Sequence, residues 1–397
     1  MLDISQLGFG YCYLAGAKAN EDEGRWPYAY VEIEAEDKPK FSGSVLEFIE
    51  KYSEKFPNIY RQLSNRVKIC PKCRKSCAFS LTSCNNCSCD LSSEPISRGD
   101  NSLTGFIYGI RYCQNYDLGT SIRYQDENFF VYDDIMQTTM IHLNSIPTFV
   151  YIPDFRYLLS RPSIGLEIVG NLFRVGNIAA KKMLENTNFC NKFYSEKARK
   201  DMMRMGFDDW IDTNVFAGFI FPPSQCQLHL QFILPPYVPY HSVLLAEGKH
   251  GDMGRFFPYR FVMKILETAI QESIQIEFKE IEEMTGIELA NYLSKRYKID
   301  YYKFFEECVG TNSRVSDYCA NWKSDDFEYV VIDKRIVVKR DDGKVETGIS
   351  AVDMIKEDQK RFQSYGKHRK GEGGMKLQYY SYARSPGELK DWENYCN

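Results

Sequence analysis

Apolar and polar residues alternate along several short segments of the chain, a period typical of half-buried β-strands. The predicted strands are residues 30–34, 104–110, 121–124, 128–132, 148–153, 215–221 and 228–234, with a hairpin at 329–339. Apolar residues at helical spacing predict helices over residues 45–56, 164–184 and 257–297, the first closed by Pro57. The basic, Gly-rich segment 366–374 predicts a loop.

Composition restricts the class of protein. A chain of 397 residues predicts two or three folding units, and 44% apolar residues suffice for a substantial core. The formal net charge of −4 gives no global attraction to nucleic acid or to an anionic membrane. No signal-peptide pattern begins the chain, and no apolar run approaches the roughly 20 residues that span a bilayer. We expect a cytoplasmic protein without a membrane segment.

Six of the thirteen cysteines lie between Cys70 and Cys89. Two Cys-x-x-Cys pairs, Cys70 with Cys73 and Cys84 with Cys87, can direct four thiolates at one tetrahedral ion. Such crowding without an export signal favours metal over disulfides, so we expect structural zinc on these four residues. Cys77 and Cys89 are alternative ligands. A redox dithiol is the competing interpretation, but it predicts one pair beside a βαβ unit.

Polar residues occupy every second position of the predicted strand 228–234 and the residues before it. Alternation places Gln227, His229 and Gln231 on one face and their apolar neighbours on the other. Buried polar side chains need hydrogen-bonding partners, which a ligand rich in acceptors and hydroxyls would supply. His229 is therefore the candidate catalytic histidine, although a lone strand histidine is more often a packing residue.

The sequence around His229 resembles the histidine-triad superfamily. Its transferase and phosphorylase branch, with galactose-1-phosphate uridylyltransferase and diadenosine tetraphosphate phosphorylase as members, carries Ser-Gln-x-His-x-His-x-Gln. Residues 224–231 read Ser-Gln-Cys-Gln-Leu-His-Leu-Gln, so Gln227 replaces the first histidine. The resemblance implies that His229 is the nucleophile, that Gln231 steadies the intermediate, and that Ser224 contacts phosphate.

Upstream residues extend the resemblance to about residues 105–241. Residues 127–135 look like the family's strand ending in Asp-Ile, which implies that Asp134 meets the ribose hydroxyls. Asn214 lies roughly where the family has a nucleotide-binding asparagine, and Gln227 is grouped with these nucleotide contacts. An insertion around His142 departs from the family pattern. The uridylyltransferases use the first motif histidine as a zinc ligand. Here four cysteines can hold the metal alone, so the resemblance does not require a histidine at position 227, where this chain has Gln227.

The resemblance implies an α+β fold with a histidine-triad-like antiparallel sheet core and flanking helices. The expected units are an N-terminal α/β region (1–62), a four-cysteine zinc ribbon (63–100), the nucleotide-binding core (101–256), and a mostly helical C-terminal region with a hairpin (257–397).

Two classes of function follow. One is a nucleotidyltransferase or phosphorylase acting on a nucleotide sugar or dinucleoside polyphosphate through a nucleotidyl-histidine at His229, with hydrolysis as a variant. The other is a catalytically degenerate binding protein that recognises a nucleotide, an RNA end or a protein partner. The resemblance leaves a homodimer open.

Overall fold

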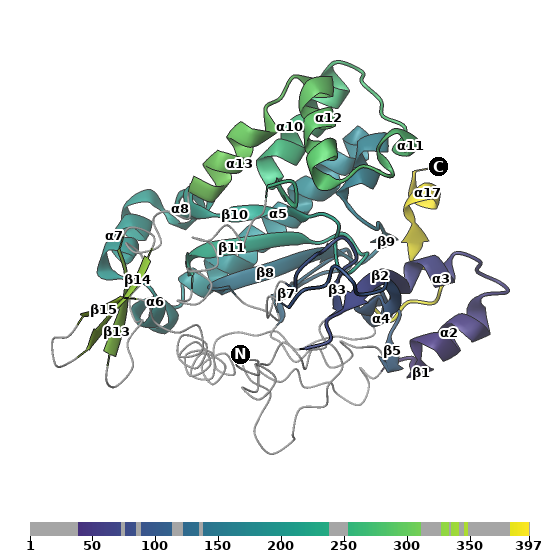
Figure 1. The fold of residues 1–397 in the computed structure, drawn as a ribbon, viewed down its shortest axis with the longest axis horizontal. Coiled ribbons are helices and arrows are strands. Elements are labelled where there is room, and N and C mark those ends of the chain that lie inside the picture. The colour runs from purple at the N-terminus through teal and green to yellow at the C-terminus, as the bar shows by residue number, and fades with distance from the viewer. Residues whose placement is uncertain are drawn as a thin grey trace.

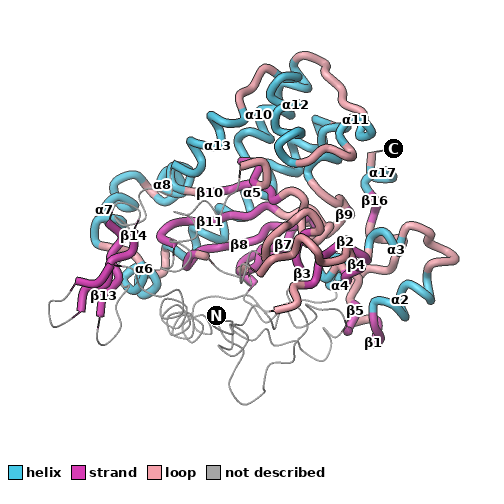
Figure 2. The backbone as a smooth tube through the Cα atoms, viewed as in Figure 1, coloured by secondary structure: helices cyan, strands magenta, loops and turns pink. Residues whose placement is uncertain are grey.

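A computed structural model describes residues 39–72, 76–84, 89–112, 122–134, 138–237, 253–310, 327–332, 335–340, 345–347 and 382–396. Its centre is a six-stranded sheet of order β12-β10-β11-β8-β7-β6, in which each neighbouring pair is antiparallel. Figure 2 shows the sheet in the middle of the molecule. The strands are β6 (Ile122–Gln125), β7 (Phe129–Asp133), β8 (Thr139–Pro147), β10 (Phe216–Ile220), β11 (Leu230–Tyr237) and β12 (Phe256–Pro258). The expectation of helices around an antiparallel sheet is confirmed.

Three of the predicted elements need correction. The helix predicted over residues 257–297 starts only at Tyr259, because Phe257 and Pro258 belong to β12, and it is divided into three helices. Residues 104–110 are not a strand: α4 (Ser102–Ile107) comes first and the short β5 (Ile110–Tyr112) follows. The side-chain oxygen of Asn101 accepts the amide of Thr104 and caps this helix, whose residues are all buried. Full burial removes the polar positions that would have shown a helical period. The predicted strand 148–153 shrinks to β9 (Val150–Tyr151).

The helix α5 (Pro162–Leu184) covers one face of the sheet, as Figure 1 shows. Directly paired residues of neighbouring strands share a face, so Leu143 of β8 and Phe232 of β11 both point toward α5. At Gly176 the helix comes close to the sheet, because a Cβ there would lie 2.8 Å from the Phe232 ring and 3.2 Å from the Ser145 hydroxyl. The helix therefore packs its glycine directly against the central strands.

The helices after β12 belong to the same hydrophobic core as the sheet. They are α10 (Tyr259–Gln271), α11 (Phe278–Ile281), α12 (Gly286–Tyr297) and α13 (Tyr301–Gly310). Ile265 of α10, Leu293 of α12 and Tyr301 of α13 lie in one buried cluster with Phe232 and Leu143. The boundary expected at residue 256 thus falls inside β12, and no separate core follows it in residues 257–310.

A second cluster joins the two ends of the described chain (Figure 1). Phe48 and Tyr108 lie in it with Tyr382 and Leu389 from near the C-terminus. An Arg61–Asp391 ion pair at 2.5 Å and the parallel pairing of β16 with β9 add to this junction. Its elements are β1 (Phe41–Ser44), α2 (Val45–Tyr52), α3 (Ile59–Gln62), α4, β5, β16 (Lys390–Asp391) and α17 (Trp392–Tyr395).

The remaining elements are shorter. A three-stranded sheet of order β3-β2-β4 carries the cysteine region, and the predicted hairpin is confirmed as β13 and β14, with β15 beside them. These elements are β2 (Ser64–Ile69), β3 (Ser76–Ala78), β4 (Ser97–Asp100), β13 (Phe327–Ile332), β14 (Arg335–Arg340), β15 (Val345–Thr347), the 3-10 helix η3 (Phe155–Ser160), α6 (Thr187–Phe193), α7 (Glu196–Met205) and α8 (Phe207–Asn214). The predictions for 30–34 and 366–374 lie outside the described residues. Among the helices that are described, none has the length and apolarity needed to cross a membrane.

Replacing Gly176 with alanine tests the contact between α5 and the sheet. The added methyl group meets the Phe232 ring, so we expect Gly176→Ala to lower the free energy of unfolding by about 1–3 kcal/mol. At Gly170 of the same helix an added methyl group would have no atom within 4 Å, so Gly170→Ala should instead stabilise by roughly 0.5–1 kcal/mol. Urea unfolding followed by circular dichroism measures both; equal effects would contradict this packing.

Candidate functional site

A row of polar side chains crosses the sheet face opposite α5. Tyr132 of β7 pairs with Asn144 of β8, and Asn144 pairs with Gln231 of β11, so the three side chains share this face. Asn144 is buried, whereas Gln231 is partly exposed. We call this set, together with Asp134, His142 and His229, the polar face of the sheet.

Asp134 and His142 extend the polar face at its β7–β8 end. The Asp134 amide donates to the His142 carbonyl at 2.7 Å, which continues the β7–β8 pairing by one residue. Asn144 Nδ2 donates to Asp134 Oδ2 at 2.6 Å, and His142 Nε2 lies 3.6 Å from the same oxygen. Thr138 N–H donates to His142 Nδ1 at 3.2 Å, so the neutral ring carries its proton on Nε2, facing the carboxylate.

The two neighbouring aspartates have different environments. Asp133 points to the α5 face, where its carboxylate accepts Arg123 Nε at 3.1 and 3.0 Å in a buried ion pair. Asp134 points to the polar face, and its side chain is 16% exposed. Strand alternation therefore directs the Asp134 carboxylate, and not that of Asp133, toward the polar face.

His229 directly precedes β11, two residues before Gln231. Its Nδ1 lies 2.7 Å from the Gln227 carbonyl oxygen, which can only accept, so Nδ1 carries the proton and donates. Burial lowers the pKa of His229 from its ordinary value of 6.5, and the Gln227 carbonyl and Asp134 oppose this shift. The ring is consequently neutral at pH 7, with the lone pair on Nε2.

Burial also lowers the pKa of His142, against the opposing influence of Asp134 and Asp133. The polar face therefore contains two neutral imidazoles at pH 7. Of these, only His229 has its Nδ1 proton fixed by a carbonyl, which is the arrangement that leaves Nε2 unprotonated for attack on an electrophile.

Gln227 does not continue the polar face. It is fully buried, and its Nε2 donates to the carbonyls of Pro147 and Val150 at 2.8 and 2.9 Å. These contacts tie the segment before His229 to the turn between β8 and β9. A nucleotide contact at Gln227 stays a prediction, but both amide hydrogens serve the fold.

The structure separates the other two predicted nucleotide contacts. Ser224 is partly exposed in the loop that leads to His229. Asn214 ends α8, buried, with its Nδ2 donating to the Trp210 carbonyl at 2.7 Å. It lies beyond Phe216, which pairs with Ile233, whereas Gly218 pairs with Gln231. Asn214 is thus several residues along the strand direction from His229.

Three contacts from β2 and from the start of α4 hold the loop before His229. Asn65 Oδ1 accepts the Cys226 amide at 2.9 Å, and Asn101 Nδ2 donates to the Cys226 carbonyl at 3.2 Å. Gln225 Oε1 accepts the Ser102 amide at 2.8 Å, at the first turn of α4. Asn65 and Asn101 are both buried, so we call them the asparagine clamp on Cys226.

The described cysteines of the ribbon gather in one small buried cluster. Cys70, Cys77 and Cys84 are buried together with Leu91, and Cys77 Sγ lies 3.7 Å from Cys84 Sγ. Cys73 and Cys87 lie outside the described residues. Within the described part of the chain, no group of three metal-ligating side chains is formed. Tetrahedral zinc with bonds of about 2.3 Å sets its sulfurs about 3.8 Å apart, so the Cys77–Cys84 spacing suits two ligands of one ion.

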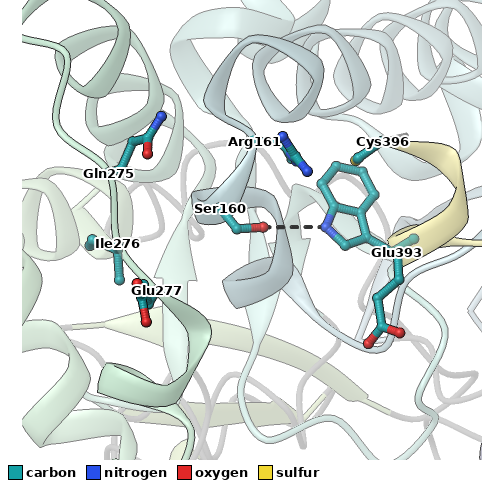
Figure 3. Close-up of a pocket in the computed structure, with 8 residues that line it drawn as sticks. Ser160, Arg161, Gln275, Ile276, Glu277, Glu393 and Cys396 are labelled. Carbon is teal, nitrogen blue, oxygen red and sulfur yellow. Dashed lines mark hydrogen bonds between the residues drawn. The ribbon is translucent and has the colours of Figure 1, made fainter.

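A pocket of about 500 Å³ lies elsewhere, between the start of α5, the segment after α10 and the C-terminal α17 (Figure 3). Arg161, Gln275 and Glu393 line it, and Trp392 Nε1 donates to Ser160 Oγ at 3.4 Å. None of the predicted site residues reaches it.

Tyr132, His142 and Asn144 are the members of the polar face that sequence reasoning did not propose as site residues. The sequence Ile141-His142-Leu143-Asn144 alternates as the strand of His229 does, and this period would have identified both β8 and its polar side.

The asparagine clamp can be tested by hydrogen exchange. Asn65→Ala removes the acceptor of the Cys226 amide, and a hydrogen bond of about 1 kcal/mol corresponds to roughly fivefold faster exchange. Mass spectrometry of peptides covering residues 224–229 measures this. Asn171→Ala removes a side-chain bond to the Glu167 carbonyl on the surface of α5 and should leave these peptides unchanged. Unaltered exchange in Asn65→Ala would show that other contacts position the loop.

Comparison of the chain with protein-family models, with curated proteins and with solved structures gives no match. Its activity must be inferred from the residues of the polar face themselves.

Proposed function

We propose that the protein is a nucleotidyltransferase or phosphorylase of histidine-triad type, acting on a nucleotide sugar or a dinucleoside polyphosphate. The observation that carries the proposal is the tautomer of His229. A carbonyl 2.7 Å from Nδ1 fixes the ring proton, and burial keeps the ring neutral, so Nε2 is a nucleophile at physiological pH.

The reaction has two balanced steps. His229 Nε2 attacks the α-phosphorus, a phosphorus–nitrogen bond forms, and the phosphorus–oxygen bond to the departing phosphate or sugar phosphate breaks with its electron pair. A phosphate or sugar-phosphate oxygen then attacks the nucleotidyl-histidine and releases Nε2. Donors placed around the equatorial oxygens stabilise the charge that builds there, and Gln231 and Ser224 are the candidates.

The other end of the polar face suits a ribose. Asp134 is the acid that the fold directs to this face, and Asn144 Oδ1 is a buried acceptor without a hydrogen-bond partner among the described residues. Buried acceptors are normally satisfied, so a ligand hydroxyl is a fitting donor for Asn144. These two side chains would orient the nucleoside while His229 reacts.

Zinc in the cysteine ribbon is part of the same proposal. Burial of Cys70 and Cys84 and the 3.7 Å Cys77–Cys84 spacing fit a thiolate site for a structural ion. Zinc would stabilise a unit whose own apolar core is small. Cys70, Cys73, Cys84 and Cys87 remain the expected ligands, and of the two alternatives, Cys77 and Cys89, the spacing favours Cys77 for one position.

Intact-mass spectrometry tests the nucleophile. Wild-type protein incubated with a panel of nucleotide sugars and dinucleoside polyphosphates should gain one nucleoside monophosphate, and His229→Ala should gain none. His368→Ala is the matched control, because it removes an imidazole that has no part in the proposed reaction. Loss of the Gln231 donor in Gln231→Ala should slow adduct formation roughly 10²–10³-fold.

The pH dependence gives a second readout. Because burial lowers the pKa of His229, the rate should stay constant from pH 8 to 6.5 and fall only below that value. Nucleotide binding without any adduct would overturn the enzymatic proposal and leave the degenerate binding protein. An adduct retained in His229→Ala would assign the chemistry to another residue.

Metal content tests the ribbon. Purified wild-type protein should contain about one zinc per chain by elemental mass spectrometry, and Cys84→Ser should lose most of it because three thiolates bind far more weakly than four. Cys77→Ser against Cys87→Ser identifies the fourth ligand. Cys396→Ser, in the last turn of the described chain, should keep full occupancy. Full zinc occupancy in the double variant Cys84→Ser/Cys87→Ser would overturn the assignment of these cysteines as zinc ligands.

A further inference from the structure

Two arginines face each other on the outer side of the cysteine ribbon's sheet. Arg66 of β2 and Arg98 of β4 form a directly opposed pair, and both side chains are exposed. Like charges at such positions repel, because their Cβ atoms lie only about 5 Å apart. Within the described residues neither guanidinium has an ion-pair partner closer than 4 Å, and the one acid on their side of the two strands is the half-buried Asp100.

Each arginine is stacked on an aromatic ring. The Arg66 guanidinium carbon lies 4.5 Å from the centre of the Phe79 ring, and that of Arg98 lies 4.7 Å from the centre of the Tyr60 ring. Stacking orders a guanidinium in advance and leaves its N–H edge open for an anion. Tyr60 is itself 53% exposed. We call these four residues the arginine–aromatic face.

The surrounding segment is basic although the chain is acidic. Residues 63–100 contain six Lys and Arg against three Asp and Glu, whereas the whole chain has a net charge of −4. Lys68 is already engaged, because its Nζ donates to the carbonyls of Leu81 and Leu91. The arginines are thus the exposed cations that two adjacent strands present together.

We propose that the arginine–aromatic face binds single-stranded nucleic acid. Arginine forks match the oxygens of a phosphodiester, and successive phosphates along a strand satisfy both guanidiniums and remove their mutual repulsion. The exposed Tyr60 ring and the partly exposed Phe79 ring offer stacking to bases without regard to sequence. An acidic peptide would satisfy the charges but leave the rings without this partner.

The face is distinct from the polar face around His229. Asn65 contacts the His229 loop from β2, and its neighbour Arg66 points to the opposite side of that strand. The binding proposed here therefore does not rest on the nucleotidyl-transfer proposal, and the two can fail separately.

Fluorescence anisotropy with the full-length protein tests the proposal. The probe is a labelled 12-nucleotide single-stranded RNA of mixed sequence, at 50 and 200 mM salt. Wild-type protein should bind it, and the double variant Arg66→Gln/Arg98→Gln should bind at least tenfold more weakly, with a salt dependence reduced by about two released counterions. Tyr60→Ala should weaken binding roughly fivefold or more through lost stacking.

The matched control is Arg204→Gln/Lys264→Gln, which removes two exposed cations from other surfaces. It should bind like wild type. An absence of binding by wild type, an equal loss in the control, or an unchanged affinity in Arg66→Gln/Arg98→Gln would overturn the proposal. Displacement of the RNA by polyglutamate of equal charge would overturn it too, because the partner would then be an acidic protein.

Discussion

The position of His229 depends on how the peptide of Cys226 is held. Asn65 accepts the Cys226 amide hydrogen and Asn101 donates to the Cys226 carbonyl, so both backbone polar groups of this residue are satisfied by buried side chains from another part of the chain. One residue further, Gln227 fixes the chain to the β8–β9 turn. Its carbonyl then accepts the His229 ring proton. The loop has no regular secondary structure, but the hydrogen bonds of Cys226 and Gln227 fix its backbone. The imidazole of His229 is therefore held in one tautomer.

The strand that supplies Asn65, one of the two residues of the asparagine clamp, leads into the cysteine cluster. Asn65 lies near the start of β2, and Cys70 follows the end of that strand. A metal ion that orders the cysteine end would therefore also order the end that holds the His229 loop. Such a unit has little apolar core, since Leu91 is the only fully buried aliphatic residue of its described cluster. Zinc binding would then affect the position of the His229 loop through the backbone of β2, without any contact between zinc and substrate.

The sequence predicts which side chains share a face where alternation along one strand determines it. His229 and Gln231 stand out by alternation, and the structure separates Asp134 from Asp133 by the same rule. The sequence does not predict hydrogen bonds between segments that are far apart in the chain. Asn65 and Asn101 are about 160 and 125 residues from Cys226, and no local period connects them. Residues 104–110 were misassigned because a wholly buried helix shows no polar side. Gln227 also follows the alternation in the sequence, but its side chain is fully buried and bonded to the Pro147 and Val150 carbonyls, so it does not share the polar face.

The burial of Gln227 bears on the chemistry that the site can perform. A carboxamide is not an acid, and the amide hydrogens of Gln227 are bonded to the carbonyls of Pro147 and Val150, so Gln227 does not protonate a leaving group. Of the nearby ionisable groups, His142 carries an Nε2 proton but directs it at Asp134. In the proposed reaction the leaving group must therefore be one that is already stable as an anion. A phosphate or sugar phosphate meets that condition and an alcohol does not, which is why the reaction we propose is transfer between phosphates.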